Sequence, residues 1–379
     1  MEISEIILMI LALFFVVGAL DRLMGNRLGL GGEFENGFKT LGTLALSMIG
    51  IISLAPLIGA ALKPAVGPLC ARIGIDPAMI PGLLFPCDMG GYTLSVELAA
   101  SREAGLYAGV IISSTIGNTT LFIIPVALEM LEEKDHPLFA CGTMCGIAAV
   151  PLGCLCGGFA AGFPARMLVA NTVPLLLFSA LLICGLLFFR KQCVRAFLFI
   201  GKLISWVISL GLALSAIRLL TGWEPVSGLA PLSASLTTIG SIALALAGAY
   251  PFCAFLRRLL KRPFASLGAR MNVAESAVGG LIYSLANCIP MFDSIKDMDD
   301  KGKLINISFA IGAAFVFGDD LAFVSSVSRE MILPMIVAKL TAGLAALAAT
   351  YLLSGTLMRY LGAGAQCGAG STVPPAKSA

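Results

Sequence analysis

The sequence predicts an all-α polytopic membrane protein that contains inverted structural repeats and two re-entrant hairpins, with about 9–11 membrane segments. Three observations support this fold class. The 379 residues are 58% hydrophobic and only 12% charged, with a mean hydropathy of +0.95, which lies well outside the range of soluble domains. Apolar segments of about 20 residues, long enough to cross a bilayer as helices, recur along nearly the whole chain. Similar blocks also recur about 200 residues apart, as inverted repeats do.

The first apolar segment, MEISEIILMILALFFVVGAL, has Glu2 and Glu5 where a signal peptide carries Lys or Arg, so we expect a membrane helix that the mature protein keeps. The apolar segments that could each cross the bilayer lie near 5–24, 40–62, 79–100, 104–128, 138–162, 168–189, 197–220, 237–257, 272–292, 303–327 and 331–357.

One membrane domain is expected over residues 1–360, because no polar block is long enough to fold alone. Its halves span about 1–162 and 197–357, and a linking helix at 168–189 joins them. The tail at 361–379 is rich in Gly, Ser, Ala and Pro and is expected to be disordered.

The distribution of basic residues between the loops indicates which of these segments cross the bilayer. If every segment crossed, the basic loops would divide almost evenly between the two sides, against the positive-inside rule. If 79–100 and 272–292 instead enter and leave on one face, most basic residues gather on a single side. The loops on that side, which is then cytoplasmic, are 21–39, 190–202, 257–270 and 293–303. This topology places the N-terminus outside and the C-terminus in the cytoplasm.

Proline and polar residues support the two hairpins independently. Pro86 and Gly90 lie near the centre of the first, and Asn287 and Pro290 lie near the centre of the second. Non-helical backbone at membrane depth is tolerated only where protein buries it or a water-filled cavity solvates it. The hairpin tips should therefore line a cavity.

Two pairs of blocks indicate the repeat. LGTLALSMIG at 41–50 resembles IGSIALALAG at 239–248, and IGNTTLFI at 116–123 resembles FGDDLAFV at 317–324. Since the two hairpins reverse the direction of the second half, the halves are expected to be inverted. Interrupted segments at matching positions of inverted repeats are the sequence sign of a secondary-transporter site near the bilayer midplane.

Each half contributes one aspartate and one asparagine, in exchanged positions. Asp88 corresponds to Asn287, and Asn118 corresponds to Asp319. An ionised carboxylate at membrane depth costs about 2.5–3.5 kcal/mol even on the gentlest scale, so it is kept where a cation or a hydrogen-bond donor meets it. The sequence therefore predicts a transporter that favours a cation. The residues expected to bind it are Asp88, Gly90, Gly91, Tyr92, Asn118, Asn287, Asp319 and Asp320.

Several of these residues also have a simpler reading. Asp88 can cap the hairpin by accepting backbone N–H groups, and Gly90 most simply serves the turn. Asp319 and Asp320 would point about 100° apart on a helix, so we expect Asp319 to face the cavity and Asp320 to be protonated or paired. Lys339 is the one basic residue deep within a span. It is expected to pair with one of these aspartates, or to replace a coupling cation.

Other classes of function fit less well. The net charge of +3, without a basic face away from the membrane, argues against nucleic-acid binding. The 11 cysteines lie mostly in apolar segments and, without histidine or carboxylate partners nearby, are not expected to hold a metal. Two intramembrane aspartates also occur in aspartyl proteases, but FVFGDD has Val316 where their motif has glycine. We therefore expect neither an enzyme nor a cofactor.

The chain resembles the ethanolamine utilisation membrane protein family, EutH, over roughly residues 1–357. The blocks that carry the resemblance are GGEFENGFKTLGTLALSMIGIISLAP, CDMGGYTLSVELA, YPFCAFL and NCIPMFDSIKDMDDKGKLINISFAIGAAFVFGDDLAF. The resemblance implies a permease of the bacterial inner membrane that imports ethanolamine for a cobalamin-dependent ammonia-lyase in the cytoplasm. It implies that Asp88 or Asp319 holds the ammonium and that Asn118 or Asn287 holds the hydroxyl.

Alternating access and a passive channel for ethanolamine or ammonium-like cations remain alternatives at this point. The sequence also leaves the coupling ion open, whether protons, sodium or none. A homodimer is expected only by analogy with other transporters that contain hairpins.

Overall fold

The structure is a computed structural model that describes residues 3–271 and 273–369 of the 379-residue chain. Over these ranges it consists of helices and short loops, without strands. Eight helices in the same ranges are long and apolar enough to cross a membrane. The prediction of an all-α polytopic membrane protein is confirmed.

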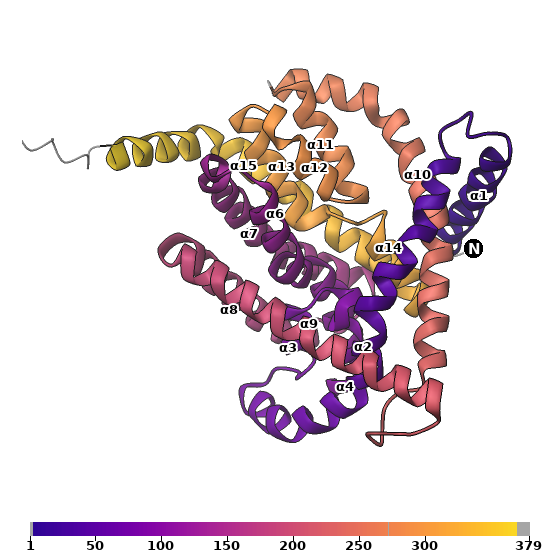
Figure 1. The fold of residues 1–379 in the computed structure, drawn as a ribbon. Coiled ribbons are helices and arrows are strands. Elements are labelled where there is room, and N and C mark those ends of the chain that lie inside the picture. Colours follow the sequence, from indigo (N-terminus) through magenta and orange to yellow (C-terminus); the bar gives the residue numbers. More distant parts are fainter. Residues whose placement is uncertain (1–2, 272, 370–379) are drawn as a thin grey trace, which may run out of the picture.

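Seven long helices make up most of the fold (Figure 1). They are α1 (Ile3–Leu23), α2 (Gly31–Ile73), α7 (His136–Ala160), α8 (Ala165–Phe188), α9 (Arg190–Thr221), α10 (Leu232–Met271) and α15 (Ile332–Ala369). A further span, Arg102–Met130, is continuous through α5 (Arg102–Leu106), the π-helical η2 (Tyr107–Gly117) and η3 (Thr119–Ile123), and α6 (Ile124–Met130).

Short helices form the interrupted parts of the fold. In the first half these are α3 (Met79–Leu84), the π-helical η1 (Cys87–Gly91), α4 (Tyr92–Leu98) and η4 (Glu133–Asp135). In the second half they are α11 (Glu275–Ala286), α12 (Ile289–Ser294), η5 (Ile295–Asp297), α13 (Asp300–Ala313), α14 (Asp319–Val327) and η6 (Arg329–Met331).

The helices α2 and α10 are longer than the apolar segments that predicted them. They have 43 and 40 residues, whereas the apolar segments cover 40–62 and 237–257. Hydropathy marks only the part of a helix that lies in lipid, and both helices continue past it. At 1.5 Å per residue each is about 60 Å long, roughly twice the hydrocarbon core of a bilayer.

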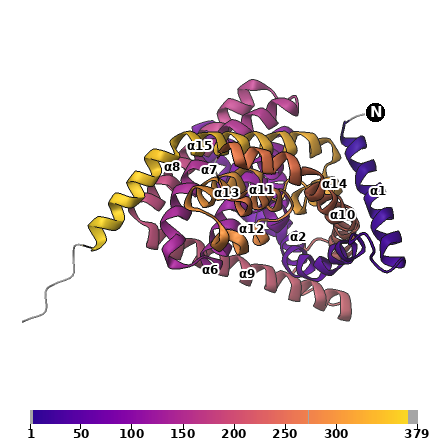
Figure 2. The ribbon, with the colours of Figure 1, turned by 90° about the horizontal axis from the view of Figure 1, so that it is seen from above.

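Glycine lets the central helices approach closely. In both views α7 and α15 lie beside α13 at the centre of the molecule (Figures 1 and 2). A Cβ on Gly153 of α7 would overlap Ala338 of α15, and a Cβ on Gly312 of α13 would overlap Gly343 of α15. Small residues at such contacts allow helices to pack in lipid, where the hydrophobic effect does not hold them together. By contrast, α1 lies at the edge (Figure 2) and is mostly exposed.

The ends of the first predicted hairpin meet. The backbone N–H of Ala100 donates to the Asp76 carboxylate at 3.2 Å, and the Ser95 hydroxyl donates to the Ala78 carbonyl at 2.9 Å. The chain turns where Phe85 and Pro86 leave the helical conformation. Residues 76–100 therefore return to the place where they entered.

The second hairpin closes in the same way. The backbone N–H of Ala274 donates to the Asp299 carboxylate at 2.9 Å, and the Ser276 hydroxyl donates to the Asp297 carbonyl at 2.7 Å. Asn287 is extended and breaks the helix between α11 and α12. An aspartate thus closes each hairpin. The inverted relation of the two halves stays a prediction.

The loops that the charge distribution assigns to one side contact each other. Glu33, at the start of α2, pairs with Arg257 of α10 at 2.8 Å. Asp135, in the loop between the segments 104–128 and 138–162 that the same topology places on this side, pairs with Lys303 of α13 at 2.7 Å, and both side chains are buried. These contacts are those expected if both hairpins are re-entrant. At the other end of the chain, α15 continues to Ala369, so the helix extends past the expected start of the tail at 361; residues 370–379 lie outside the described residues.

Candidate functional site

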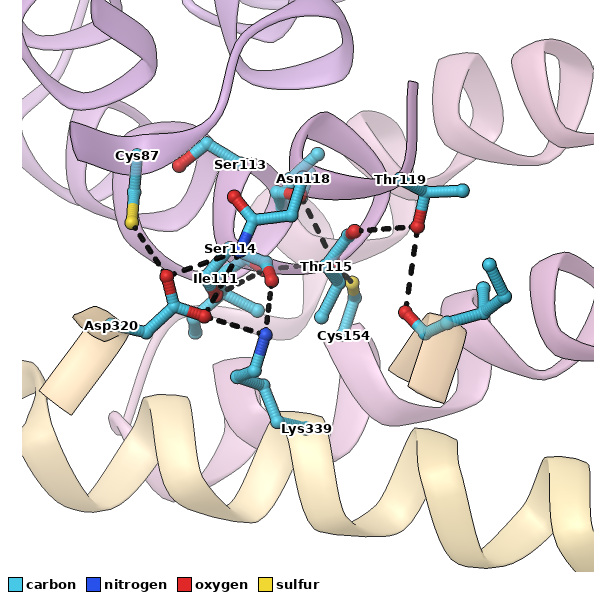
Figure 3. A network of polar contacts seen from close by, with 12 residues as sticks. Cys87, Ile111, Ser113, Ser114, Thr115, Asn118, Thr119, Cys154, Asp320 and Lys339 are labelled. Carbon is cyan, nitrogen blue, oxygen red and sulfur yellow. Dashed lines mark hydrogen bonds and ion pairs between the residues drawn. The ribbon is translucent and has the colours of Figure 1, made fainter. Parts of the chain in front are cut away.

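A buried ion pair links α14 to α15, both in the second half of the chain. Asp320 lies in the first turn of α14, directly after the break that separates α13 from α14. Its Oδ2 is 2.7 Å from Nζ of Lys339 on α15, and the two residues are only 2% and 1% exposed. The same ammonium donates to the Ser114 carbonyl of η2 (Figure 3). Lys339 therefore forms the ion pair that the sequence predicts with one of the two aspartates.

The first half supplies two further donors to Asp320. Asn118, 4% exposed, donates through Nδ2 to both carboxylate oxygens at 3.1 and 3.0 Å. The Cys87 thiol, at the tip of the first hairpin, donates to Oδ1 at 3.1 Å. Figure 3 shows these groups converging on Asp320 from three elements. We call Asp320, Lys339, Asn118 and Cys87 the buried cluster. In it, Oδ1 of Asn118 has no partner among the described residues.

The Ser114 carbonyl that accepts from Lys339 lies in the π-helical η2. Wide π-turns displace carbonyl groups from the regular i to i−4 pattern, and they are common at functional sites. Thr119, one turn later, donates its hydroxyl to the Thr115 carbonyl at 3.0 Å and to the Ile311 carbonyl of α13 at 3.4 Å. A polar seam therefore links the Arg102–Met130 span to α13 and α15 inside an otherwise apolar core.

Asp319 points away from the buried cluster. Its Oδ1 accepts a hydrogen bond of 2.9 Å from the hydroxyl of Tyr250 on α10, and its Oδ2 accepts one of 3.4 Å from Nδ2 of Asn287. Successive residues of a helix point about 100° apart, which explains why the two adjacent aspartates have separate partners. The sequence predicted that Asp320 would be protonated or paired, and it is paired with Lys339. That Asp319 faces a cavity stays a prediction, because the cavity beside it is lined by its two donors and not by Asp319 itself.

A cavity of about 340 Å³ lies on the other side of Tyr250 and Asn287. Because both of these lining residues donate to Asp319, the carboxylate lies directly behind the cavity wall. Asn287 is held in place by a second bond, since its Oδ1 accepts from the backbone N–H of Ile289, the first residue of α12, at 2.9 Å. The residues that line this inner cavity are Glu33, Asn36, Tyr250, Cys253, Arg257, Tyr283, Ala286, Asn287, Ile289 and Pro290.

Asp88 adds a third carboxyl group. It is half-buried in η1 at the tip of the first hairpin, directly after Cys87, whose thiol donates to Asp320. Among the described side chains no cation lies within 4 Å of Asp88 or Asp319, and Lys339 alone neutralises Asp320. Of the three carboxyl groups only Asp320 has an ammonium partner in the described part of the chain, so the other two could be met by a cation from outside the chain.

The remaining predicted residues have mainly structural contacts. Gly90 has φ +109°, and a Cβ there would overlap Ile51, while a Cβ on Gly91 would overlap the Phe85 carbonyl. These glycines allow the tight turn at the hairpin tip. Tyr92 packs edge-to-face on Phe323 at 5.8 Å. It lines a different cavity, with Ser101, Arg102 and Ser328, so it lies away from the inner cavity.

Sequence analysis did not identify Tyr250 or Cys87. Tyr250 directly precedes Pro251 in the middle of an apolar span. A phenol hydroxyl at membrane depth needs a hydrogen-bond partner, and that requirement could have marked the residue. Cys87 gave no signal, since a cysteine in an apolar segment is usually a small hydrophobic residue.

Comparison with known proteins identifies the family of this chain. The family model described as "Ethanolamine utilisation protein, EutH" matches residues 3–353. The probable ethanolamine permease EutH of Listeria monocytogenes is 42% identical over 359 residues, 95% of this chain and 96% of the relative. The protein of the same name from Salmonella typhimurium is 36% identical over 391 residues, covering 93% and 96%. The uncharacterized protein YxeR of Bacillus subtilis is 42% identical, covering 92% and 94%. No solved structure matches.

Proposed function

Because the chain belongs to the EutH ethanolamine utilisation family, we propose that it is a transporter of the bacterial inner membrane that imports ethanolamine by alternating access. Relatives at 36–42% identity that cover more than nine-tenths of the chain carry the name probable ethanolamine permease. The eight apolar helices of the described ranges agree with a multi-pass membrane protein.

We place the ammonium of ethanolamine against Asp319. The observation that carries this assignment is a carboxylate behind a cavity wall that has two neutral donors, Tyr250 and Asn287, and no cation within 4 Å among the described side chains. Neutral donors fix the position of the carboxylate but leave its charge uncompensated. A primary ammonium that enters the inner cavity would compensate it. Asp88, which follows the Cys87 that contacts Asp320, is a second carboxyl group that would add to this attraction.

Two groups can accept a hydrogen bond from the substrate hydroxyl. The Tyr250 hydroxyl donates to Asp319 and keeps free lone pairs that can accept from ethanolamine. Oδ1 of Asn118, which is buried and without a partner among the described residues, is a second acceptor on the side of the buried cluster. A cavity of about 340 Å³ is ample for a molecule of this size. The amide of Asn287 already donates through Nδ2 to Asp319 and accepts through Oδ1 from Ile289, so its role is to position Asp319.

The buried cluster supports alternating access over an open pore. Its ion pair is at most 2% exposed and Asn118 is 4% exposed, so the cluster is closed to bulk solvent in this conformation. The inner cavity is lined on one side by Glu33 and Arg257, near the basic loops that the positive-inside rule assigns to the cytoplasm. We therefore interpret this conformation as closed to the outside, with the inner cavity on the cytoplasmic side of the buried cluster.

The test is uptake of labelled ethanolamine into proteoliposomes, with and without a proton or sodium gradient. Asp319→Asn removes the charge and keeps the shape, and we expect it to abolish saturable uptake. Asp88→Asn should reduce it. Asp293→Asn, the same change at an exposed position of α12, is the matched control and should transport like the unmodified protein.

Each outcome has a defined meaning. Saturable uptake that survives Asp319→Asn would refute the assigned ammonium site. Uptake that never exceeds the external concentration under any gradient would favour the alternative, a passive channel for ethanolamine or ammonium-like cations. The gradient that drives accumulation would identify the coupling ion.

A further inference from the structure

A second cavity lies next to the inner one. It has a volume of about 670 Å³ and is lined by Gly29, Glu33, Ala254, Arg257, Arg258, Glu275, Ser276, Val278, Gly279, Ile282, Tyr283 and Ser294. We call it the outer cavity because it lies at the loops 21–39 and 257–270, which the positive-inside rule assigns to the cytoplasm. Glu33, Arg257 and Tyr283 line both cavities. These three side chains therefore form the partition between them.

We propose that Glu33 is a second binding site for a primary ammonium group. The ammonium of the substrate binds there transiently as the substrate moves between the inner and the outer cavity. The proposal rests on the transport function proposed above. It adds a residue and a step that lie outside the Asp319 site. In the described conformation Arg257 forms an ion pair with this carboxylate, with Nη2 2.8 Å from Oε1 of Glu33.

The geometry of the pair suits an exchange. The side chains of Glu33 and Arg257 are 29% and 34% exposed, so water reaches both and the pair is held less firmly than the buried Asp320–Lys339 pair. The Arg257 guanidinium also lies over the ring of Tyr283, 5.7 Å from its centroid. Arg257 therefore keeps a favourable cation–π contact when it releases Glu33.

A released Arg257 has a second acceptor within the outer cavity. Glu275, in the first turn of α11, lines that cavity together with Arg257. The ammonium of the substrate can thus take the place of the guanidinium on Glu33 while Arg257 keeps its contact with Tyr283 in a cavity that Glu275 also lines. The partition opens during this exchange, because its closure depends on the contact between Glu33 and Arg257.

The experiment measures access to Cys253, which lines the inner cavity behind the partition and is 5% exposed. It uses the full-length protein with Cys253 as its only cysteine. Two reagents are compared, methyl methanethiosulfonate, which is neutral, and 2-aminoethyl methanethiosulfonate, which carries a primary ammonium on a two-carbon arm. In both reactions the thiolate attacks the sulfenyl sulfur, forms a mixed disulfide and releases methanesulfinate, and the thiol proton goes to water. Intact mass gives the two rates.

We compare Glu33→Gln and Arg257→Gln with the control Glu35→Gln. Glu35 lies two residues further along α2 and pairs with Arg22 at 2.6 Å, but it lines neither cavity. Both test variants should speed the neutral reagent, because each breaks the contact that closes the partition. Glu33→Gln should also lower the ratio of the cationic to the neutral rate by about tenfold, the low end of what a charge in a cleft contributes to association. Arg257→Gln should keep or raise this ratio.

The outcomes separate the parts of the proposal. An unchanged ratio in Glu33→Gln would show that Glu33 does not bind the ammonium. A neutral rate that stays the same in both variants would show that the pair is not the partition, and a similar change in Glu35→Gln would show that the effect is general to α2. The labelling requires no transport, so its result is independent of the uptake test with Asp319→Asn.

Discussion

Replacing Lys339 by Met should destabilise the protein more than any change at an exposed ion pair. Methionine keeps the length and volume of the side chain and removes its charge. Asp320 would then remain 2% exposed, with only the neutral donors Asn118 and Cys87. Removing one partner of a buried ion pair typically costs about 3–5 kcal/mol, because it leaves an uncompensated charge in the interior.

The expected shift in Tm follows from this energy. At roughly 2–4 °C per kcal/mol for a large domain, Lys339→Met should lower Tm by about 6–20 °C. The measurement is thermal unfolding of the purified protein in detergent, followed by intrinsic fluorescence. Lys39→Met is the matched control, since Lys39 is exposed and lies 3.8 Å from Glu35, and it should change stability by no more than about 0.5 kcal/mol.

A second change tests the cause. Adding Asp320→Asn to Lys339→Met removes the unpaired charge and keeps an acceptor for Asn118. The double variant should therefore recover most of the lost stability, as buried pairs do when both charges are replaced. A single variant as stable as the unmodified protein, or a double variant that is less stable than the single, would refute the reasoning.

Two further predictions concern the second hairpin and its neighbour. Gly318→Ala should cost about 1–3 kcal/mol in thermal unfolding, because the new methyl group would overlap the Ala286 carbonyl; Gly240→Ala, where a Cβ meets open space, should be neutral or slightly stabilising. Equal Tm changes in the two variants would contradict the close packing at Gly318. Tyr250→Phe removes the hydroxyl that donates to Asp319 at 2.9 Å. The same hydroxyl is the proposed acceptor for the hydroxyl of ethanolamine, and a neutral hydrogen bond contributes about 0.5–1.5 kcal/mol, so KM for ethanolamine uptake should rise by roughly two- to tenfold. An unchanged KM would place Tyr250 outside the site.

The fold was predictable where a local pattern has one physical solution. A run of about 20 apolar residues must form a helix in lipid, because only a helix satisfies its own backbone there. Pro86 and Asn287 marked the hairpin breaks for a related reason, since they interrupt backbone bonding at membrane depth. Hydropathy did not show how far α2 and α10 continue, because their end turns lie beyond the apolar stretch.

The site was predictable only in part. Asp88 and Asp319 were identifiable because a carboxylate is costly in an apolar segment. Their partners depend on contacts between residues far apart in the chain. Asn118 and Asp320 are 202 positions apart, and Tyr250 and Asp319 are 69 apart. No local pattern encodes such a pair, so the fold is needed to show which aspartate meets Lys339 and which lies behind a cavity.

The position of Lys339 in the last long helix has a consequence for biosynthesis. A lysine opposes the insertion of a membrane helix by at most about 2.5–3.5 kcal/mol, the cost at the helix centre. The groups that receive its ammonium, Ser114 and Asp320, precede it in the chain and leave the ribosome first. The insertion of α15 is therefore favoured once the earlier segments have assembled. A chain that stops before Lys339 leaves the charge of Asp320 unpaired in the bilayer, so premature termination would yield a product that quality-control proteases can distinguish from the finished protein.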